Sequence, residues 1–364
     1  MEFGLSQDQK MMQDSVHRTL ERAAPLARVR EAAEANAIAR DVHKALADLG
    51  VTGLLIPESF GGAGLKLLDA ALVSETLGRH AAPVPFIAAS VMAPLALIHA
   101  GSPEQQQRVL PKLAAGETIA GVAIAESVSG TRDGAGLTAS GGKLNGKALF
   151  VMDFADADLF VVADRACGLH LVEANAPGLT KTSLISIDRT RTLGEIACNN
   201  TPAEPLQNGN AAEVLSRMRD AGWVMLAADT LGAGWHMIDQ AVAYAKERKQ
   251  FDRVIGSFQA VKHMCAEMAA ELEPCRSLVW YAAHAFDAIP ADAALTAAHA
   301  KAHTSEIGRF VARTATEVHG GMGMTDLLGL HYWFKRIGLN RQLLGGPERV
   351  RDLAAAMQGF AAAS

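Results

Sequence analysis

The first third of the chain has the spacing of hydrophobic residues that is typical of amphipathic helices. Apolar residues recur every three or four positions over Gln7–Arg30, Asn36–Leu49 and Leu67–Arg79, so one face of each segment is apolar. The glycine-rich stretch IPESFGGAGL, residues 56–65, interrupts them. It follows no clear strand and therefore does not indicate a dinucleotide-binding turn. The pattern predicts an N-terminal α-helical domain over residues 1–118.

The pattern changes to period two from Ile119 to about Pro205. The stretches GVAIAES, KLNGKALFVM, DLFVVAD and LHLVEA alternate between apolar and polar positions, as half-buried strands do. Turn-forming segments, SGG, NG, FADAD and NAPG, separate them. Residues 119–205 are therefore predicted to form a small antiparallel, β-barrel-like domain.

Long helical periodicity returns beyond Glu213. Apolar positions between Trp223 and Ala245 form one continuous stripe, which is typical of a helix buried in a bundle. Gly232 and Gly234 lie in this stripe and predict a close approach of neighbouring helices. Further helices are expected over Ser257–Ala288, Asp292–Val318, Leu327–Arg341 and Pro347–Phe360. Residues 206–364 thus form a four-helix-bundle domain, and the fold class is α+β, mostly α.

Composition narrows the class of protein. The 364 residues are 49% hydrophobic and 20% charged with a net charge of −5, which is typical of a globular protein and does not favour nucleic acid as a partner. The apolar stretch Ala81–Ile98 contains three prolines and is expected to be a buried helix rather than a membrane span. The four cysteines lack metal-type spacing, and His299 and His303 lack a third ligand. No metal site is predicted, and the expected location is the cytoplasm.

The stretch RKQFDRVIGSFQAVKH, residues 248–263, contains more charged, amide and aromatic side chains than a helix–helix turn requires. Gly256 permits a turn and Ser257 is a suitable N-cap for the following helix. A guanidinium such as that of Arg248, beside a helix N-terminus, is a good receptor for pyrophosphate. Phe251 could cover an adenine or ribose face. On these residues alone, a solvated turn with Phe251 in the core is the favoured interpretation, and the pyrophosphate receptor is the alternative.

The same stretch resembles the signature of the acyl-CoA dehydrogenase family, R-x-QF-x-x-x-IG-x-FQ-x-x-x-H. IPESFGGAGL, LNGKALFVMDFADADLFVVA, HGGMGMT, HYWFKR and LLGGPERVRDLA resemble further family segments in the same order. The resemblance implies FAD that lies extended between two subunits. It also implies a set of residues that contact the pyrophosphate and adenosine of a neighbouring subunit's FAD: Arg248, Gln250, Phe251, Phe258, Gln259, Glu317, Gly320 and Gly321. Glu317 stands where the family usually has Gln.

The resemblance implies α,β-dehydrogenation of an acyl-CoA, in which a carboxylate removes the α-proton. The family places this base in one of two positions. The connector before the last helix reads Leu344-Gly345-Gly346 here, and counting back from Arg248 on the first bundle helix leads to Gly222. The nearest acids are Asp220, Asp229 and Glu348, and none is predicted to act as the base. No catalytic residue is assigned to this chain.

The expected flavin-ring site also departs from the family pattern. The family's A-x-TEP-x-x-GSD stretch becomes AIAESVSGTRD, with Ala125 in place of a threonine and Ser127 in place of a proline. Phe150-Val151-Met152 replaces a Trp-Ile-Thr sequence. Alanine and methionine lack the hydroxyl groups that would hydrogen-bond the flavin.

These departures lead to one interpretation and two alternatives. The chain resembles the base-lacking subunit of heterotetrameric α2β2 bacterial acyl-CoA dehydrogenases, whose homologous catalytic partner would hold the flavin ring. The implied substrate is a bulky acyl-CoA, a steroid side chain being the first choice, with electron-transfer flavoprotein as a possible acceptor. A self-sufficient homotetrameric dehydrogenase with a relocated base, and a flavin-free acyl-CoA-binding or scaffold protein, remain open.

Overall fold

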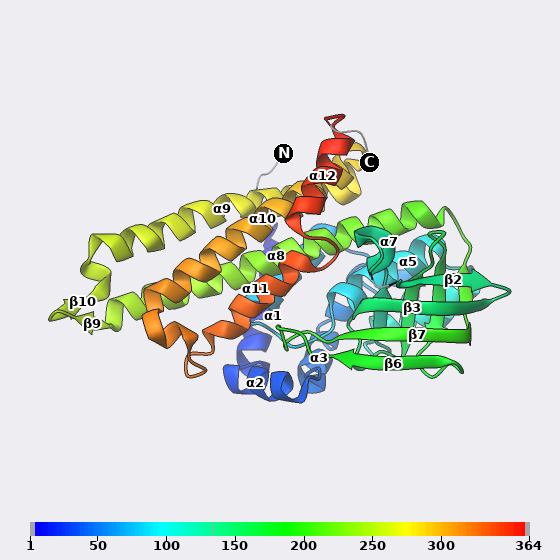
Figure 1. The fold of residues 1–364 in the computed structure, drawn as a ribbon, viewed down its shortest axis with the longest axis horizontal. Coiled ribbons are helices and arrows are strands. Elements are labelled where there is room, and N and C mark those ends of the chain that lie inside the picture. Colours follow the sequence, from blue (N-terminus) through cyan, green and yellow to red (C-terminus); the bar gives the residue numbers. More distant parts are fainter. Residues whose placement is uncertain (1–3, 133, 361–364) are drawn as a thin grey trace.

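The computed structural model describes residues 4–132 and 134–360. The polypeptide forms a helical part, a β-sheet and a second helical part in chain order (Figure 1). The predicted mostly helical α+β class is confirmed. Among the described residues, no helix combines the length and apolarity that a membrane span requires.

Six α-helices form the N-terminal part. Their bounds are α1 Gln7–Ala23, α2 Leu26–Ala35, α3 Arg40–Ala47, α4 Leu67–Arg79, α5 Ala93–Ala100 and α6 Pro103–Ala114. The expectation of one helix over Gln7–Arg30 is wrong, because the helix ends at Ala23 and Pro25 is the N-cap of α2. Proline has no amide hydrogen with which to continue the hydrogen-bond ladder of α1. Ala81–Ile98 is buried as expected and contains a π-helical segment, Ile87–Met92, that continues into α5.

The β-sheet has the strand order β6-β7-β3-β1-β4-β5-β8, and β2 pairs with β3. Its elements are β1 Ala120–Ala123, α7 Ala125–Ser129, β2 Gly136–Ser140, β3 Lys143–Met152, β4 Leu159–Ala163, β5 Leu169–Glu173, β6 Leu179–Leu184, β7 Leu193–Pro202 and β8 Glu204–Leu206. The pairing is antiparallel as expected except between β1 and β4. These two are parallel because the chain passes through α7, β2 and β3 between them.

The C-terminal bundle is built around α8, Ala211–Glu247, which packs against α4, α9, α10 and α11. The other elements are the hairpin strands β9 Lys249–Gln250 and β10 Arg253–Val254, then α9 Gln259–Ala288, α10 Pro290–His319, α11 Leu330–Gln342 and α12 Pro347–Met357. Asn210 starts α8 by accepting hydrogen bonds from the amides of Ala212 and Glu213. The bundle extends away from the β-sheet and carries the β9–β10 hairpin at its far end (Figure 1).

Close helix packing at glycine positions confirms one sequence prediction. A Cβ atom at Gly232 would collide with the backbone carbonyl of Glu75 on α4, and a Cβ at Gly78 would collide with that of Asp229 on α8. A Cβ at Gly234 would lie 2.8 Å from Leu272 Cδ2 on α9. The glycines therefore allow the backbones of α4 and α8 to approach more closely than larger residues permit.

Candidate functional site

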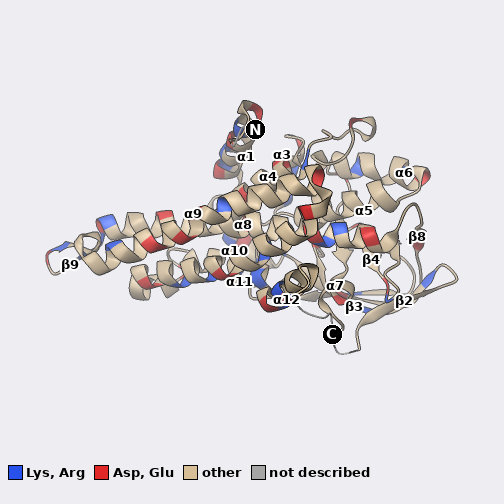
Figure 2. Cartoon of the chain, turned by 90° about the horizontal axis from the view of Figure 1, so that it is seen from above, with Lys and Arg blue, Asp and Glu red and all other residues tan. Residues whose placement is uncertain are grey.

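The first part of the candidate site is the β9–β10 hairpin between α8 and α9. Arg248 caps the C-terminus of α8, and its carbonyl accepts a hydrogen bond from the amide of Ile255 at 2.8 Å. Phe251 and Asp252 form the turn with φ of 52° and 60°. The Phe251 side chain is 88% exposed, so the alternative that places it in the core is wrong. Basic residues outnumber acidic ones at this tip, with Lys246, Arg248, Lys249 and Arg253 against Glu247 and Asp252 (Figure 2), and this excess favours an anionic ligand.

The hairpin also orders the start of α9. Phe258 is half-buried, with the Arg253 guanidinium 3.8 Å from its ring centroid and the Phe251 ring edge-on at 6.2 Å. Gln259 is the first residue of α9, and Phe258 is its N-cap. The expectation that Ser257 caps the helix is wrong, because the Ser257 hydroxyl donates to the carbonyl of Val254 at 2.7 Å. No side chain caps α9, so its first amides remain available to an anion.

The second part of the candidate site lies at the C-terminal end of α10. Gly320 has a φ of 58°, and nothing lies within 4 Å of a Cβ built at Gly320 or Gly321. His319 stacks on Tyr244 of α8 with ring centroids 4.7 Å apart. This contact brings the glycine turn to the same end of the bundle as Arg248. The exposed Glu317 lies 3.8 Å from Arg313 on its own helix.

All eight residues predicted to contact FAD thus lie on two neighbouring segments at one end of the bundle. They combine an exposed guanidinium, uncapped helix amides, an exposed aromatic ring and open backbone at two glycines. These groups fit a nucleotide diphosphate. Their contact with the cofactor stays a prediction.

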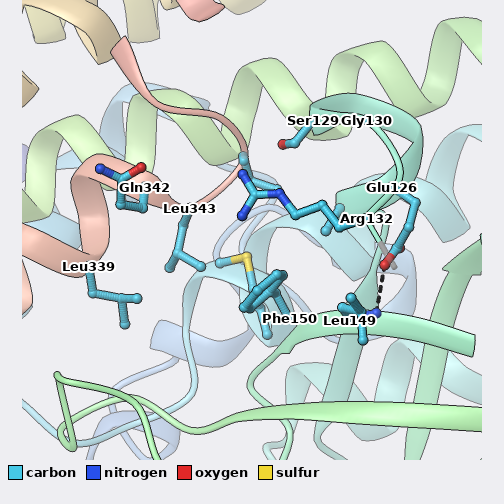
Figure 3. Close-up of a pocket in the computed structure, with 12 residues that line it drawn as sticks. Glu126, Ser129, Gly130, Arg132, Leu149, Phe150, Leu339, Gln342 and Leu343 are labelled. Atoms are coloured by element: carbon cyan, nitrogen blue, oxygen red, sulfur yellow. Dashed lines mark hydrogen bonds between the residues drawn. The ribbon is translucent and has the colours of Figure 1, made fainter. Parts of the chain in front are cut away.

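A cavity of about 160 Å³ occupies the position expected for the flavin ring. Its walls come from α7, β3 and the connector between α11 and α12, and Arg132 extends across it towards Leu343 (Figure 3). The Arg132 guanidinium lies 5.9 Å from the Phe150 ring centroid. The lining side chains at 125 and 152 are the alanine and methionine noted in the sequence. Positions 125 and 152 therefore lack the hydroxyl groups that the resemblance implies, and the hydroxyl of Ser129, which has no hydrogen-bond partner among the described residues, is a donor at a different position of the lining.

Glu126 is a carboxylate of this cavity that the sequence analysis did not single out. Its Oε1 accepts a hydrogen bond from the amide of Leu149 at 2.6 Å, and burial raises the pKa of its carboxyl group (Figure 3). It lies between Ala125 and Ser127, two positions that the family comparison did consider. The sequence pattern did not predict the short helix α7, and it is this helix that places Glu126 on the cavity wall.

The two family positions for the base hold no carboxylate, and the surrounding packing closes one of them. Gly345 has a φ of 106°, which side chains of L-residues rarely tolerate. Trp223 Nε1 donates to the carbonyl of Leu344 at 2.8 Å and holds the connector against α8. A Cβ at Gly222 would lie 2.5 Å from Leu344 Cδ1 and 3.2 Å from Met92 Sδ. Leucine and methionine side chains therefore fill the space beside position 222.

The three acids nearest to these positions already have basic partners. Asp220 Oδ1 accepts from Arg219 Nη2 at 2.7 Å, and Glu348 Oε1 accepts from Arg341 Nη2 at 2.6 Å. Burial alone would raise the pKa of Asp229, but the guanidinium groups of Arg191 and Arg336 outweigh burial and lower it to about 2. Asp229 is therefore a buried, ionised partner of two arginines. The absence of a base among these three residues stays a prediction.

A helical part, a β-sheet and a helical bundle, with the predicted diphosphate half-site at the far end of the bundle, are the arrangement expected of a three-part, nucleotide-dependent oxidoreductase. Models of the acyl-CoA dehydrogenase N-terminal and C-terminal domains match residues 6–117 and 213–358. The chain therefore belongs to the acyl-CoA dehydrogenase family, is an enzyme of that class, and uses the family cofactor FAD. The resemblance inferred from the sequence motifs is confirmed.

Relatives with assigned names span nearly the whole chain. Acyl-CoA dehydrogenase IpdE2 of Mycolicibacterium smegmatis is 30% identical over 354 residues, which cover 96% of this chain and 99% of the relative. The ChsE4-ChsE5 complex of Mycobacterium tuberculosis matches with a TM-score of 0.90 and 26% identity over all of both chains. A structure described as the Tcur3481-Tcur3483 steroid ACAD G363A variant matches with a TM-score of 0.88 and 28% identity, over 98% and 99% of the two chains. Two of these relatives are complexes of two different chains.

Proposed function

We propose that this chain is the base-lacking subunit of a heteromeric, FAD-dependent acyl-CoA dehydrogenase. In this proposal it supplies the pyrophosphate and adenosine half-site, through the eight residues at the end of the bundle, to a homologous catalytic subunit. FAD supplies the hydride acceptor in this chemistry. The contribution of the present chain is to bind and orient the diphosphate.

The single observation that carries the proposal is the conformation of Gly345. The family places a carboxylate at this position, whereas the backbone here has a φ of 106° and favours glycine. The second family position, Gly222, is closed by Leu344 and Met92. The anion-type half-site is retained while both base positions are lost, which is the pattern that a paired enzyme requires.

The proposed substrate is a bulky acyl-CoA thioester with a steroid-derived acyl group. Support comes from the likeness to the structure described as a steroid ACAD, which covers 98% of this chain. The proposed oligomer is α2β2, the proposed compartment is the cytoplasm, and electron-transfer flavoprotein is a suitable electron acceptor.

The test is co-expression with a base-containing acyl-CoA dehydrogenase homologue from the same genome, followed by purification on a tag carried by this chain. The complex should be yellow, and Arg248→Ala should weaken FAD binding by about 10- to 100-fold, because a charge-assisted contact to the diphosphate is lost. Arg248→Lys should retain part of the affinity. The exposed Arg309, paired with Glu306 on α10, provides the matched control, since Arg309→Ala should leave flavin content unchanged. Unchanged flavin content in Arg248→Ala would contradict the half-site.

Glu126 favours one alternative, a self-sufficient dehydrogenase with a relocated base. Its raised pKa and its place on the cavity wall are properties of a general base. Purification of this chain without a partner distinguishes the self-sufficient dehydrogenase from the paired enzyme. A yellow protein that is bleached by an acyl-CoA, and that loses this reaction in Glu126→Gln, would support the alternative; a colourless, inactive chain supports the paired enzyme.

A further inference from the structure

The cavity between α7, β3 and the connector after α11 has an apolar interior with a positively charged side chain across it (Figure 3). Six large apolar side chains form most of its wall: Leu149, Phe150, Met152, Leu339, Leu343 and Leu344. The guanidinium of the exposed Arg132 lies 5.9 Å from the centroid of the Phe150 ring. A ligand in this cavity therefore meets hydrocarbon on most sides and one positive charge.

A second guanidinium, that of Arg349 on α12, lies beside the same lining. A Cβ atom built at Gly130, a residue of the cavity wall, would lie 3.6 Å from Arg349 Nη1. Among the described side chains that line the cavity, the one acid is Glu126. Burial raises the pKa of its carboxyl group, so it opposes the two guanidinium groups less than an ordinary carboxylate would. The balance of charge at this end of the cavity therefore favours an anion.

The hydroxyl of Ser129 adds a hydrogen-bond donor for that anion. Ser129 Oγ is buried and has no hydrogen-bond partner among the described residues. A Cβ atom built at Gly345 would lie 3.8 Å from this oxygen, so the hydroxyl faces the connector that forms one wall of the cavity. A buried donor without an acceptor costs free energy, which a ligand oxygen recovers. A planar carboxylate has two such oxygens, and one can pair with a guanidinium while the other accepts from a hydroxyl.

The volume of the cavity limits the apolar part of the ligand. The cavity has about 160 Å³, and an apolar protein cavity of about 150 Å³ holds one benzene molecule. Its size is therefore that of one ring rather than of the three fused rings of a flavin. The Phe150 ring, which is 39% exposed, offers an aromatic contact to such a body.

We propose that this cavity binds a small organic carboxylate whose apolar body has the size of a single ring. The carboxylate pairs with Arg132 and accepts a hydrogen bond from the Ser129 hydroxyl, while the body lies against Phe150 and Met152. This inference rests on the proposed function, under which no flavin ring enters the cavity of this chain. It gives the cavity a ligand of its own, a free acid rather than a coenzyme A thioester.

The experiment is calorimetric titration of benzoate, with benzamide as its uncharged counterpart, into the complex of this chain with the base-containing homologue. Benzoate should bind once per copy of this chain and more tightly than benzamide. Arg132→Met should weaken benzoate binding by about 10- to 100-fold, because a charge-assisted contact is lost while the length of the side chain is kept. Ala125→Leu adds no charge but reduces the space for the ring, and it should weaken benzoate and benzamide alike, by at least about 10-fold. Circular dichroism and melting temperature check that both variants fold.

Arg309→Met, which removes an exposed guanidinium of α10, is the matched control and should bind benzoate as the wild type does. Arg248→Ala should hold flavin weakly but bind benzoate normally, which separates the half-site from the cavity. Equal affinity for benzoate and benzamide, or equal affinity of the wild type and Arg132→Met for benzoate, overturns the carboxylate site. A flavin-containing complex that does not bind benzoate overturns this inference alone. A flavin ring bound by this chain without a partner overturns the proposed function as well.

Discussion

At the scale of single residues, the fully buried Arg336 makes hydrogen bonds to three separate parts of the chain. Its guanidinium donates to Asp229 Oδ1 and Oδ2 at 2.9 and 2.7 Å, to Thr190 Oγ1 at 2.8 Å and to the carbonyl of Ala82 at 3.1 Å. Asp229 Oδ2 also forms an ion pair with Arg191 Nη2 at 2.8 Å. One side chain of α11 thereby holds α8, the loop before β7 and the segment after α4 in a fixed arrangement.

Arg336→Ala should therefore destabilise the protein by about 3–5 kcal/mol, because Asp229 keeps its buried charge but loses its bidentate partner. The measurement is the free energy of unfolding in urea at pH 7. Arg309→Ala removes a guanidinium that is 58% exposed and pairs with Glu306 at 3.0 Å, so it should cost no more than about 1 kcal/mol. Equal losses in the two variants would contradict the assigned role of Arg336.

At the scale of secondary-structure elements, the contact between α4 and α8 depends on two glycines. Gly78 on α4 and Gly232 on α8 each face a backbone carbonyl of the other helix. The packing therefore has no space for even one methyl group. This contact sets the position of α8. On one side of the contact, Gly222 of α8 packs against the connector, and at the C-terminal end of α8, Arg248 begins the hairpin.

Gly78→Ala should lower the free energy of unfolding by about 3 kcal/mol, because a methyl group forces apart two helices that meet through backbone atoms. Gly338, an exposed position of α11 with no atom within 4 Å of a built Cβ, is the matched control. Gly338→Ala should be stabilising by about 0.5–1 kcal/mol, since alanine has the higher helix propensity. Thermal unfolding of the two variants checks the difference in sign.

At the scale of the whole molecule, two half-buried histidines lie where the N-terminal helices meet the bundle, next to the hydrogen bond that Trp333 Nε1 donates to the carbonyl of Arg79 at 2.9 Å. His80, after α4, lies with its Nε2 2.8 Å from Nδ1 of His17 on α1. His236 of α8 stacks on Trp333 of α11 with ring centroids 3.8 Å apart. Burial, with the nearby positive charge of Arg79, lowers the pKa of His80 to about 4 and that of His236 to about 3.

These shifts predict a loss of stability in mild acid. The ordinary pKa of histidine is about 6.5, so the unfolded chain binds more protons than the folded one as the pH falls from about 6.5 towards 4. The stability contributed by neutral His80 and His236 is present above pH 6.5 and is lost over this range. The lowered pKa of Asp229 acts in a separate window, below about pH 4.

The check is the free energy of unfolding measured between pH 7 and pH 4.5 in the wild type and in the double variant His80→Asn/His236→Asn. The slope against pH should be smaller in the variant, even if its stability at pH 7 is lower. His43 and His99, whose pKa values are also lowered by burial, account for the slope that remains. An unchanged slope would show that the two rings are not the buried groups that titrate.

The fold class was predictable because periodicity is a property of neighbouring residues along the chain. The alternation near KLNGKALFVM predicted β3, and the apolar stripe around Trp223 predicted α8. The errors were local: Pro25 divides a helix that periodicity joined, and Ser257 bonds backwards instead of capping α9. Both the helix end at Pro25 and the position of the Ser257 hydroxyl depend on hydrogen bonds between residues within one turn. A pattern of hydrophobic positions contains no information about these hydrogen bonds.

Motif spacing was sufficient to find the family and to locate glycine at position 345, because both depend on which residue occupies which position. The eight half-site residues come from the same spacing and stay a prediction. Packing alone decided that Leu344 and Met92 close the space beside Gly222 and that Glu126 reaches the cavity between α7, β3 and the α11–α12 connector. These contacts join residues that are distant in the chain. Their geometry depends on the distance between the backbones of packed elements, and a pattern of neighbouring residues in the sequence does not encode that distance.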